Sequence, residues 1–274
     1  TLTVSGAMTV RSSGFCAPNN STIAGVGTVV NQGTLDLKNS NVSASTALDN
    51  QGTLVLNGTI AMNGPLTTAP GTIVRLQGDG TTGFATLTSA ASLTNNGTIE
   101  LTSITSAYGA TLAVTGAGTL TNAAGATITS LVGAGGTRTL DAQLNNLGTV
   151  TMLQPLTLSH ASAAHSNSGT IDATGADVTI NQSGTSPSFT NSGTLTIGAG
   201  RTGTVSGGAF TNISTGVLNG GGALLLSNAT SSIQSSGFTL GSLNVSGGTA
   251  SFAANLSTGV QALSFTSTTI NGPG

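Results

Sequence analysis

A five-residue unit, asparagine–any residue–glycine–threonine–aliphatic, recurs along this chain and constrains its fold more than any other feature. Complete copies of the unit begin at Asn31, Asn50, Asn95, Asn146, Asn167 and Asn191. Looser copies begin at Ala69, Asn122 and Asn212. Repeats of this length bury their apolar side chains only against neighbouring copies. The recurrence therefore predicts a solenoid in which each copy belongs to one turn.

The spacing of these units predicts how a turn is built. The aligned asparagine positions are separated by 19, 19, 26, 27, 24, 21, 24 and 21 residues, which indicates a turn of fixed core with loops of variable length at its corners. A residue two positions before the asparagine is expected to point into the core. That position holds Val29, Leu48, Thr67, Leu93, Leu120, Leu144, His165, Phe189 and Phe210. Leu35, Asp36 and Leu37 then alternate with the period of two that is typical of a strand.

Each residue type in the unit has an expected physical role. Stacked asparagine amides can form a hydrogen-bonded ladder from turn to turn. We predict such a ladder of Asn31, Asn50, Asn95, Asn122, Asn146, Asn167, Asn191 and Asn212. Glycine can adopt the positive φ that a tight corner needs. We predict this role for Gly33, Gly52, Gly71, Gly97, Gly148, Gly169 and Gly193.

The composition fits a thin aliphatic core under an uncharged surface. The 274 residues include five Lys and Arg and seven Asp and Glu, with a net charge of −2, and aromatic residues make up 3%. Five scattered basic residues cannot neutralise a row of phosphates, so we expect no nucleic-acid partner. No apolar run approaches ~18 residues, so no helix is expected to span a membrane. Cys16 is the only cysteine, which excludes a disulfide within the chain.

We predict one continuous solenoid over residues 1–274, with roughly a dozen turns of about 19–27 residues each. Residues 1–30 are expected to form one irregular turn with a corner at 15–19, and residues 31–216 carry the repeats. Residues 217–274 are interpreted as degenerate turns, because apolar residues still alternate at 222–226, 238–240 and 263–265. Neither end shows an evident cap, and open strand edges favour end-to-end pairing.

Two segments resemble repeats of known surface proteins. Residues 48–56, Leu-Asp-Asn-Gln-Gly-Thr-Leu-Val-Leu, resemble the repeats of filamentous-haemagglutinin-like adhesins. Residues 218–224, Leu-Asn-Gly-Gly-Gly-Ala-Leu, are similar to autotransporter passenger repeats. The resemblance covers roughly residues 29–225 and implies an all-β, single-stranded, right-handed parallel β-helix on a bacterial surface or in an extracellular fibre. Such repeats serve adhesion, scaffolding and display alike.

Two groups of residues could carry chemistry, and each also has a structural interpretation. Residues 198–203 match Gly-x-Gly-x-x-Gly, but Thr-Val-Ser-Gly-Gly follows where a dinucleotide site needs a helix, so we expect a loop between turns. Asp172 and Asp177 are the closest pair of acids, as a polysaccharide-cleaving site would need. We expect the acids to solvate the surface instead. They are Asp36, Asp49, Asp79, Glu100, Asp141, Asp172 and Asp177.

The histidines and the cysteine leave alternatives open. His165 falls in the inward column, so we expect a neutral histidine bonded to the asparagine ladder. With His160 and the acids it could instead form a metal or acid–base group. For Cys16 we expect a buried thiol beside Phe15, and pairing with another subunit is the alternative.

Outward threonines raise the possibility of ice binding, because regular Thr-x-Thr rows on a flat solenoid can bind ice. The outward pairs within the repeats are Thr34/Asp36, Thr53/Val55, Thr98/Glu100, Thr149/Thr151, Thr170/Asp172 and Thr194/Thr196. Only two of these six pairs are Thr-x-Thr, and charged residues interrupt the rows. The repeats alone therefore do not predict a continuous ice-binding row, and ice binding stays an alternative function.

The sequence thus predicts a non-enzymatic, extracellular or cell-surface structural protein without metal or cofactor. Its solenoid would belong to a surface adhesin or to a self-associating fibre subunit. Expected partners are other copies end to end, the rest of a longer chain, or a host-surface or matrix ligand. A polysaccharide-binding or polysaccharide-cleaving β-helix and an ice-binding solenoid are the alternative functions.

Overall fold

The computed structural model describes residues 1–105, 107–252, 257–258 and 262–272. They form an all-β parallel solenoid of about 12 turns with about 21 residues per turn, and the described residues contain no helix. The predicted class of fold is therefore confirmed. The chain divides into two compact units, Thr1–Ala142 (unit 1) and Gln143–Gly274 (unit 2).

Three short strands make up most turns, and they follow one another along the chain onto three faces, A, B and C. The strands form because aliphatic residues alternate with threonine and other polar residues, a pattern suited to a half-buried extended backbone. In β6 (Thr34–Lys38), Leu35 and Leu37 are fully buried while Thr34 and Asp36 are half-buried. Each strand thus presents one apolar row to the interior.

In unit 1, each face holds strands that recur once per turn. Face A consists of β1 (Leu2–Thr3), β4 (Thr22–Ala24), β7 (Asn41–Val42), β10 (Thr59–Met62), β13 (Ala85–Ser89), β16 (Ala110–Val114) and β19 (Arg138–Asp141). Face B consists of β2 (Ala7–Val10), β5 (Thr28–Asn31), β8 (Ala47–Asn50), β11 (Leu66–Thr68), β14 (Leu93–Asn95) and β17 (Thr119–Asn122). Face C consists of β3 (Phe15–Cys16), β6, β9 (Thr53–Asn57), β12 (Ile73–Gly78), β15 (Thr98–Ser103) and β18 (Thr127–Ser130).

Unit 2 repeats the arrangement. Face A consists of β22 (Leu156–Leu158), β25 (Val178–Asn181), β28 (Thr202–Ser206), β31 (Ala223–Ser227), β34 (Ser242–Ser246) and β37 (Ala262–Thr266). Face B consists of β20 (Gln143–Asn146), β23 (Ala164–Asn167), β26 (Ser188–Asn191), β29 (Ala209–Asn212), β32 (Thr230–Ile233), β35 (Thr249–Phe252) and β38 (Thr269–Asn271). Face C consists of β21 (Thr149–Met152), β24 (Thr170–Ala173), β27 (Thr194–Ile197) and β30 (Val217–Asn219), followed by the separate pair β33 (Gly237–Phe238) and β36 (Ser257–Thr258).

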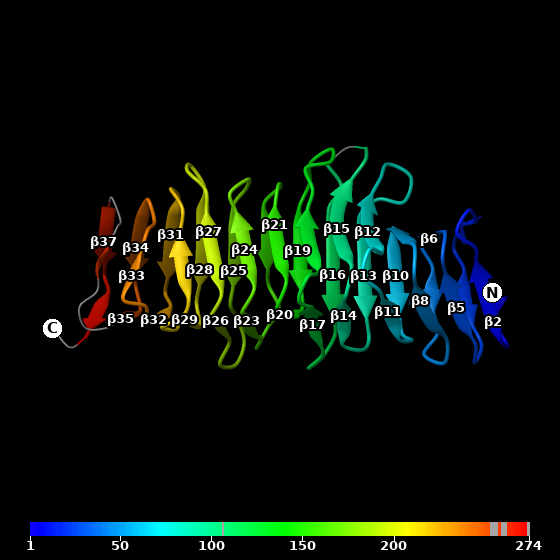
Figure 1. Ribbon diagram of the computed structural model, residues 1–274, viewed down its shortest axis with the longest axis horizontal. Coiled ribbons are helices and arrows are strands. Elements are labelled where there is room, and N and C mark those ends of the chain that lie inside the picture. Colours follow the sequence, from blue (N-terminus) through cyan, green and yellow to red (C-terminus); the bar gives the residue numbers. More distant parts are fainter. Residues whose placement is uncertain (106, 253–256, 259–261, 273–274) are drawn as a thin grey trace. The chain divides into compact units, whose positions relative to one another are not determined.

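The pairing within each unit is parallel and places like residues above like residues. On face C of unit 1, β9 pairs with both β6 and β12, so that Leu35, Leu54 and Val74 stack in one buried column. On face A of the same unit, β10, β13 and β16 lie side by side (Figure 1). A slip of one residue would turn every buried side chain outward, so the aliphatic columns fix this register.

The repeat beginning at Ala69 is out of register with the prediction. Leu66 pairs with Leu48 and Thr68 pairs with Asn50, so Thr68 takes the asparagine position and the predicted inward residue, Thr67, is exposed. Ile73, and not Thr72, then pairs with Thr53. The corner between Thr68 and Ile73 is two residues longer than that between Asn50 and Thr53. The prediction therefore placed the asparagine position one residue too late, at Ala69, and the threonine position one residue too early, at Thr72.

The two ends of the chain also differ in part from the prediction. Leu2 pairs with Ile23, so residues 1–30 hold a full turn and the start of the next, not a single turn. Phe15 and Cys16 pair with Thr34 and Leu35 in a strand, where a corner was expected. Strands β30 to β38 occupy the predicted degenerate region, of which residues 253–256, 259–261 and 273–274 lie outside the described residues.

Candidate functional site

In unit 2, buried asparagines stack at the ends of the face B strands. The Asn146 amide nitrogen donates to the Asn167 amide oxygen at 2.7 Å, and equivalent bonds of 2.7 Å join Asn167 to Asn191 and Asn191 to Asn212. Asn212 donates to the Ser235 hydroxyl at 2.9 Å. All four asparagines have no exposed surface. A buried amide is expensive unless it is bonded, so this ladder holds consecutive turns at one spacing.

In unit 1, the corresponding asparagines form two shorter stacks. Asn31 donates to Asn50 at 2.7 Å, and Asn95 donates to Asn122 at 2.8 Å. Thr68 stands between the two stacks, where its hydroxyl accepts the Asn96 N–H at 2.8 Å and donates to the Thr94 carbonyl at 3.1 Å. The Thr68 hydroxyl thus takes the place of the amide and bonds to the backbone of the following turn.

The asparagine amides also join face B to face C across the corner. The Asn31 nitrogen donates to the Thr53 carbonyl at 2.8 Å, in addition to its bond with Asn50. Asn146 donates in the same way to the Thr170 carbonyl at 3.0 Å. Each side chain therefore ties two strands of the following turn, which explains why an amide with two donors and an acceptor is needed.

Most of the corner glycines are required for a reason other than the predicted positive φ. Of the predicted corner residues, Gly71 has a φ of 81°. The backbones of Gly33, Gly52, Gly97, Gly169 and Gly193 lie outside the left-handed region. A Cβ added at Gly52, Gly169 or Gly193 would instead lie far inside 3.0 Å of the carbonyl oxygen of the equivalent glycine one turn earlier. Close stacking of the corners excludes a side chain there.

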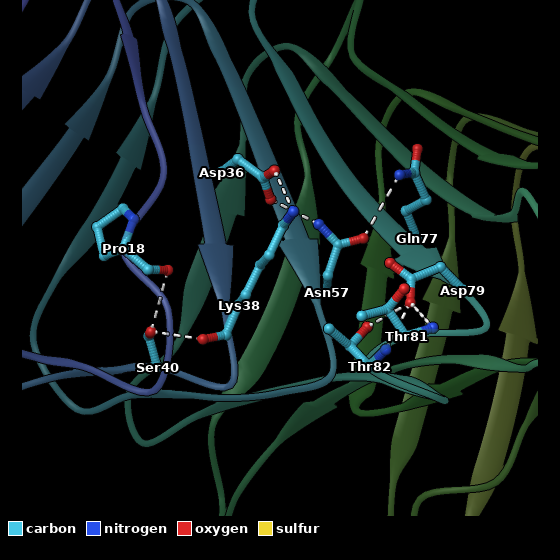
Figure 2. A network of polar contacts seen from close by, with 9 residues as sticks. All are labelled: Pro18, Asp36, Lys38, Ser40, Asn57, Gln77, Asp79, Thr81 and Thr82. Carbon is cyan, nitrogen blue, oxygen red and sulfur yellow. Dashed lines mark hydrogen bonds and ion pairs between the residues drawn. The ribbon is translucent and has the colours of Figure 1, made fainter.

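Charged residues gather on the outer side of face C in unit 1 (Figure 2). The Lys38 ammonium lies 3.3 Å from the Asp36 carboxylate, which also accepts the Asn57 amide N–H at 2.6 Å. The Asn57 oxygen accepts from the Gln77 amide at 3.4 Å. These residues lie one above another on β6, β9 and β12, so the network links three turns. Within it, the positive charge of Lys38 is paired with the negative charge of Asp36.

A second ion pair on face C escaped the sequence prediction. The Arg75 Nε lies 2.6 Å from Glu100 Oε2, and the two residues are register partners on β12 and β15. From the sequence, Arg75 was expected only as one of five scattered basic residues. Val74 and Leu76 on either side of it are the buried pair, and their alternation is the signal that could have corrected the alignment.

Asp79 closes a tight turn after β12. Its carboxylate accepts the N–H groups of Thr81 at 2.7 Å and Thr82 at 2.6 Å and the Thr82 hydroxyl at 2.9 Å (Figure 2). Burial by itself raises the pKa of Asp79, but these hydrogen bonds, with Lys38 nearby, lower the pKa below its ordinary value. The carboxylate is therefore held ionised as a structural acceptor.

Among the residues that the structure describes, Arg138 is the largest fully buried side chain, although we expected only a scattered basic residue there. Its Nε donates to the carbonyl of Leu101 at 3.0 Å, and its Nη2 donates to those of Leu131 and Val132, both at 3.2 Å. Burial lowers the pKa of the guanidinium. The side chain fits because its register partner on β16 is Ala110, and the residue in register one turn beyond, on β13, is Ala85.

His165 lies in the inward column of face B, as predicted, but its hydrogen-bond partner differs from the prediction. Its Nδ1 accepts the backbone N–H of Leu144 at 3.1 Å, not an amide of the ladder. This bond requires a neutral ring with the proton on Nε2, which finds no partner among the described residues. Burial, with a smaller contribution from His160, lowers the pKa of His165 to about 4. The ring is thus a neutral core group.

The remaining candidates have structural roles where the structure describes them. The Asp172 carboxylate accepts the Thr174 N–H at 3.0 Å, and that of Asp177 accepts the Thr202 N–H at 2.9 Å. Residues 198–201 link β27 to β28, whereas Thr202 and Gly203 of the predicted 198–203 loop belong to β28. Cys16 is half-buried beside a largely exposed Phe15, so the expected fully buried thiol is not found. Within the described residues, no three His, Cys, Asp or Glu side chains gather as a metal site would need.

A groove of about 580 Å³ lies beside β30 and β33 in unit 2. It opens where face C is interrupted, because β30 and the following strand share only one isolated bridge, Asn219 to Thr239. Its walls are formed by residues 214–218 and 235–239, which are serines, threonines and glycines with Val217, Leu218 and Phe238. These side chains offer neutral hydroxyls and apolar contacts, but no acid–base chemistry.

Comparisons with protein-family models, with curated proteins and with solved structures found no match to this chain. In the described part of the chain, there is no helix of the length and apolarity needed to cross a membrane. The geometry alone therefore defines a class, a parallel β-solenoid repeat protein whose turns are joined by buried amides.

Proposed function

We propose that this chain is a non-enzymatic structural protein of the extracellular space or cell surface, serving as the solenoid of a surface adhesin or of a self-associating fibre. The observation that carries the proposal is the stacked asparagine ladder, in which buried side chains bond each turn to the next. The resemblance of residues 48–56 to filamentous-haemagglutinin-like repeats and of 218–224 to autotransporter passengers supports the same class.

The repeated turn also supports self-association. Each turn presents to its neighbour a row of backbone donors and acceptors in parallel register, as β9 does to both β6 and β12. A strand edge left unpaired offers the same groups to a second copy. The net charge of −2 provides little repulsion against such contacts.

The fibre form of the proposal is tested by assembly at rising protein concentration, followed by negative-stain electron microscopy and sedimentation velocity. We expect filaments whose formation changes little between about 0.01 M and 1 M salt, over which the Debye length falls from about 30 Å to 3 Å. Hydrogen-bonded edges, unlike charged surfaces, are insensitive to that screening. Particles that stay monodisperse at every concentration would exclude the fibre subunit and leave the adhesin scaffold.

The adhesin form is tested by binding of the purified chain to immobilised matrix proteins and to cells. Saturable binding that survives heating below the unfolding transition, and is lost above it, would support a surface formed by the folded solenoid. Absence of binding to every surface, together with absence of filaments, would contradict both forms of the proposal.

A further inference from the structure

Face A of unit 1 carries an uninterrupted row of threonines that the repeat alignment did not reveal. Thr59 pairs with Thr86, Thr86 with Thr111, and Thr111 with Thr139. The residues between them on each strand, such as Leu87 and Leu112, are fully buried, so the four threonines face outward. We call Thr59, Thr86, Thr111 and Thr139 the threonine row.

The second outward column of this face is also small and nearly free of charge. It consists of Ala61, Thr88, Ala113 and Asp141, in register across the same four strands. Adjacent strands are about 4.8 Å apart, and alternate residues on one strand are about 7 Å apart. The face therefore presents methyl and hydroxyl groups on a regular two-dimensional grid.

The hydroxyls of this row are available to an external partner. Within the described residues, the side chains of the threonine row and of Thr88 make no hydrogen bond, although many other hydroxyls of the chain do. Threonine is restricted at χ1, so stacked copies hold their hydroxyls in similar orientations. The row is thus an ordered array of unused donors and acceptors.

Face C of the same unit provides a comparison, because its outward side lacks these properties. Its threonine column is interrupted by Ile73, between Thr53 and Thr98. Its second column holds Asp36 and the Arg75–Glu100 ion pair. Charged groups keep a hydration shell of their own that is costly to remove. Contact between face C and an uncharged solid would require removal of this bound water, so face C is a poor binding surface for such a solid.

We propose that face A of unit 1 binds ice, with the threonine row as the contact. Ice is an uncharged, periodic array of hydrogen-bonding groups, and it is complementary to an uncharged, periodic array of hydroxyls separated by methyl groups. A crystalline polysaccharide shares the periodicity, but sugar rings pack best against aromatic side chains, which this face lacks. The inference does not rest on filament formation or on adhesion.

The test is thermal hysteresis and ice-crystal shape, measured on the purified chain and on two matched variants. The unmodified chain is expected to shape ice crystals and to show hysteresis. Thr111→Tyr, at the middle of the threonine row, is expected to lose most of that activity because the ring lifts the ice from the face. Thr98→Tyr, an equally half-buried position on face C, is expected to retain it.

Circular dichroism and the unfolding temperature of each variant separate a surface effect from misfolding. If Thr111→Tyr does not fold, Thr86→Lys provides a second disruption of the row, with the same expected loss. Absence of hysteresis in the unmodified chain, or equal loss in Thr111→Tyr and Thr98→Tyr, would overturn the proposal. Binding to microcrystalline cellulose without any effect on ice would overturn it in favour of a polysaccharide surface.

Discussion

The side-chain nitrogen of Asn167 donates at once to the amide oxygen of Asn191, at 2.7 Å, and to the backbone carbonyl of Thr194, at 3.1 Å. The Asn167 oxygen meanwhile accepts from Asn146. One fully buried side chain thus connects three turns and the corner between two faces. The same relationship, repeated, makes the ladder the main polar element of the core.

Replacing Asn167 with alanine is expected to destabilise the fold by about 3 kcal/mol, because it removes the acceptor of the buried Asn146 nitrogen and the donor to the buried Asn191 oxygen and opens a cavity. Urea unfolding followed by circular dichroism measures this change. Asn181→Ala, an exposed asparagine on β25, is the control and should alter stability by less than about 0.5 kcal/mol. Similar losses in both variants would contradict a special role for the ladder.

Replacing Gly52 with alanine is expected to destabilise unit 1, because the new Cβ would overlap the Gly33 carbonyl one turn earlier. The turns would have to separate, at a cost of about 1–3 kcal/mol. Gly6→Ala is the matched control, since a Cβ there meets nothing within 4 Å and the backbone is not left-handed. Thermal unfolding of the two variants should differ clearly. If Gly52→Ala were as stable as Gly6→Ala, close stacking would not explain the glycine.

Stability is expected to fall as the pH is lowered from about 6.5 toward 4, because of His165. The pKa of this ring is about 4 in the folded chain and 6.5 when unperturbed, so the unfolded state binds more protons in this window. The loss should approach about 3 kcal/mol, at about 1.4 kcal/mol per pH unit.

Chemical unfolding at a series of pH values in the unmodified chain and in His165→Phe checks this prediction. Phenylalanine is the residue at the paired position, Phe189, so the variant keeps the column apolar. The slope over this window should be much smaller in His165→Phe and only slightly smaller in His160→Ala, because His160 makes the lesser contribution to the pKa of His165. An identical slope in the unmodified chain and in His165→Phe would assign the effect to other groups.

Replacing Arg138 with methionine is expected to destabilise unit 1 by about 2–4 kcal/mol. Methionine fills much of the volume and removes a buried charge, but it leaves the carbonyls of Leu101, Leu131 and Val132 without their donor. Limited proteolysis should show faster cleavage near residues 131–137. Arg201→Met, at an exposed position, is expected to be neutral. Unchanged stability of Arg138→Met would mean that water can replace the guanidinium.

Much of the fold could be predicted because residues close together in the sequence determine it. The alternation of Leu35, Asp36 and Leu37 specifies a strand with one buried side, and the recurrence of the asparagine unit specifies how often the strand returns. These signals need only near neighbours along the chain. They were sufficient for the parallel solenoid, for most of the inward column and for the positions where buried amides meet.

The errors arose where contacts between turns determine the register of a strand or the burial of a side chain. The corner after Thr68 is two residues longer than that after Asn50, and no local signal shows which residue pairs with which across the gap. The pairing of Arg75 with Glu100 follows only from this register. In the same way, Arg138 reads as a surface residue until the alanines stacked beside it on face A reveal the space that it fills.

The sequence by itself determined the period, the strands and the identity of the stacked asparagines, because alternation and repetition are properties of neighbouring residues. The tertiary structure alone decided which carbonyl lies against each corner glycine, what His165 bonds, and that the unbroken threonine row stands on face A. Each of these depends on atoms about 20 residues or more apart, which only the stacking of turns brings together.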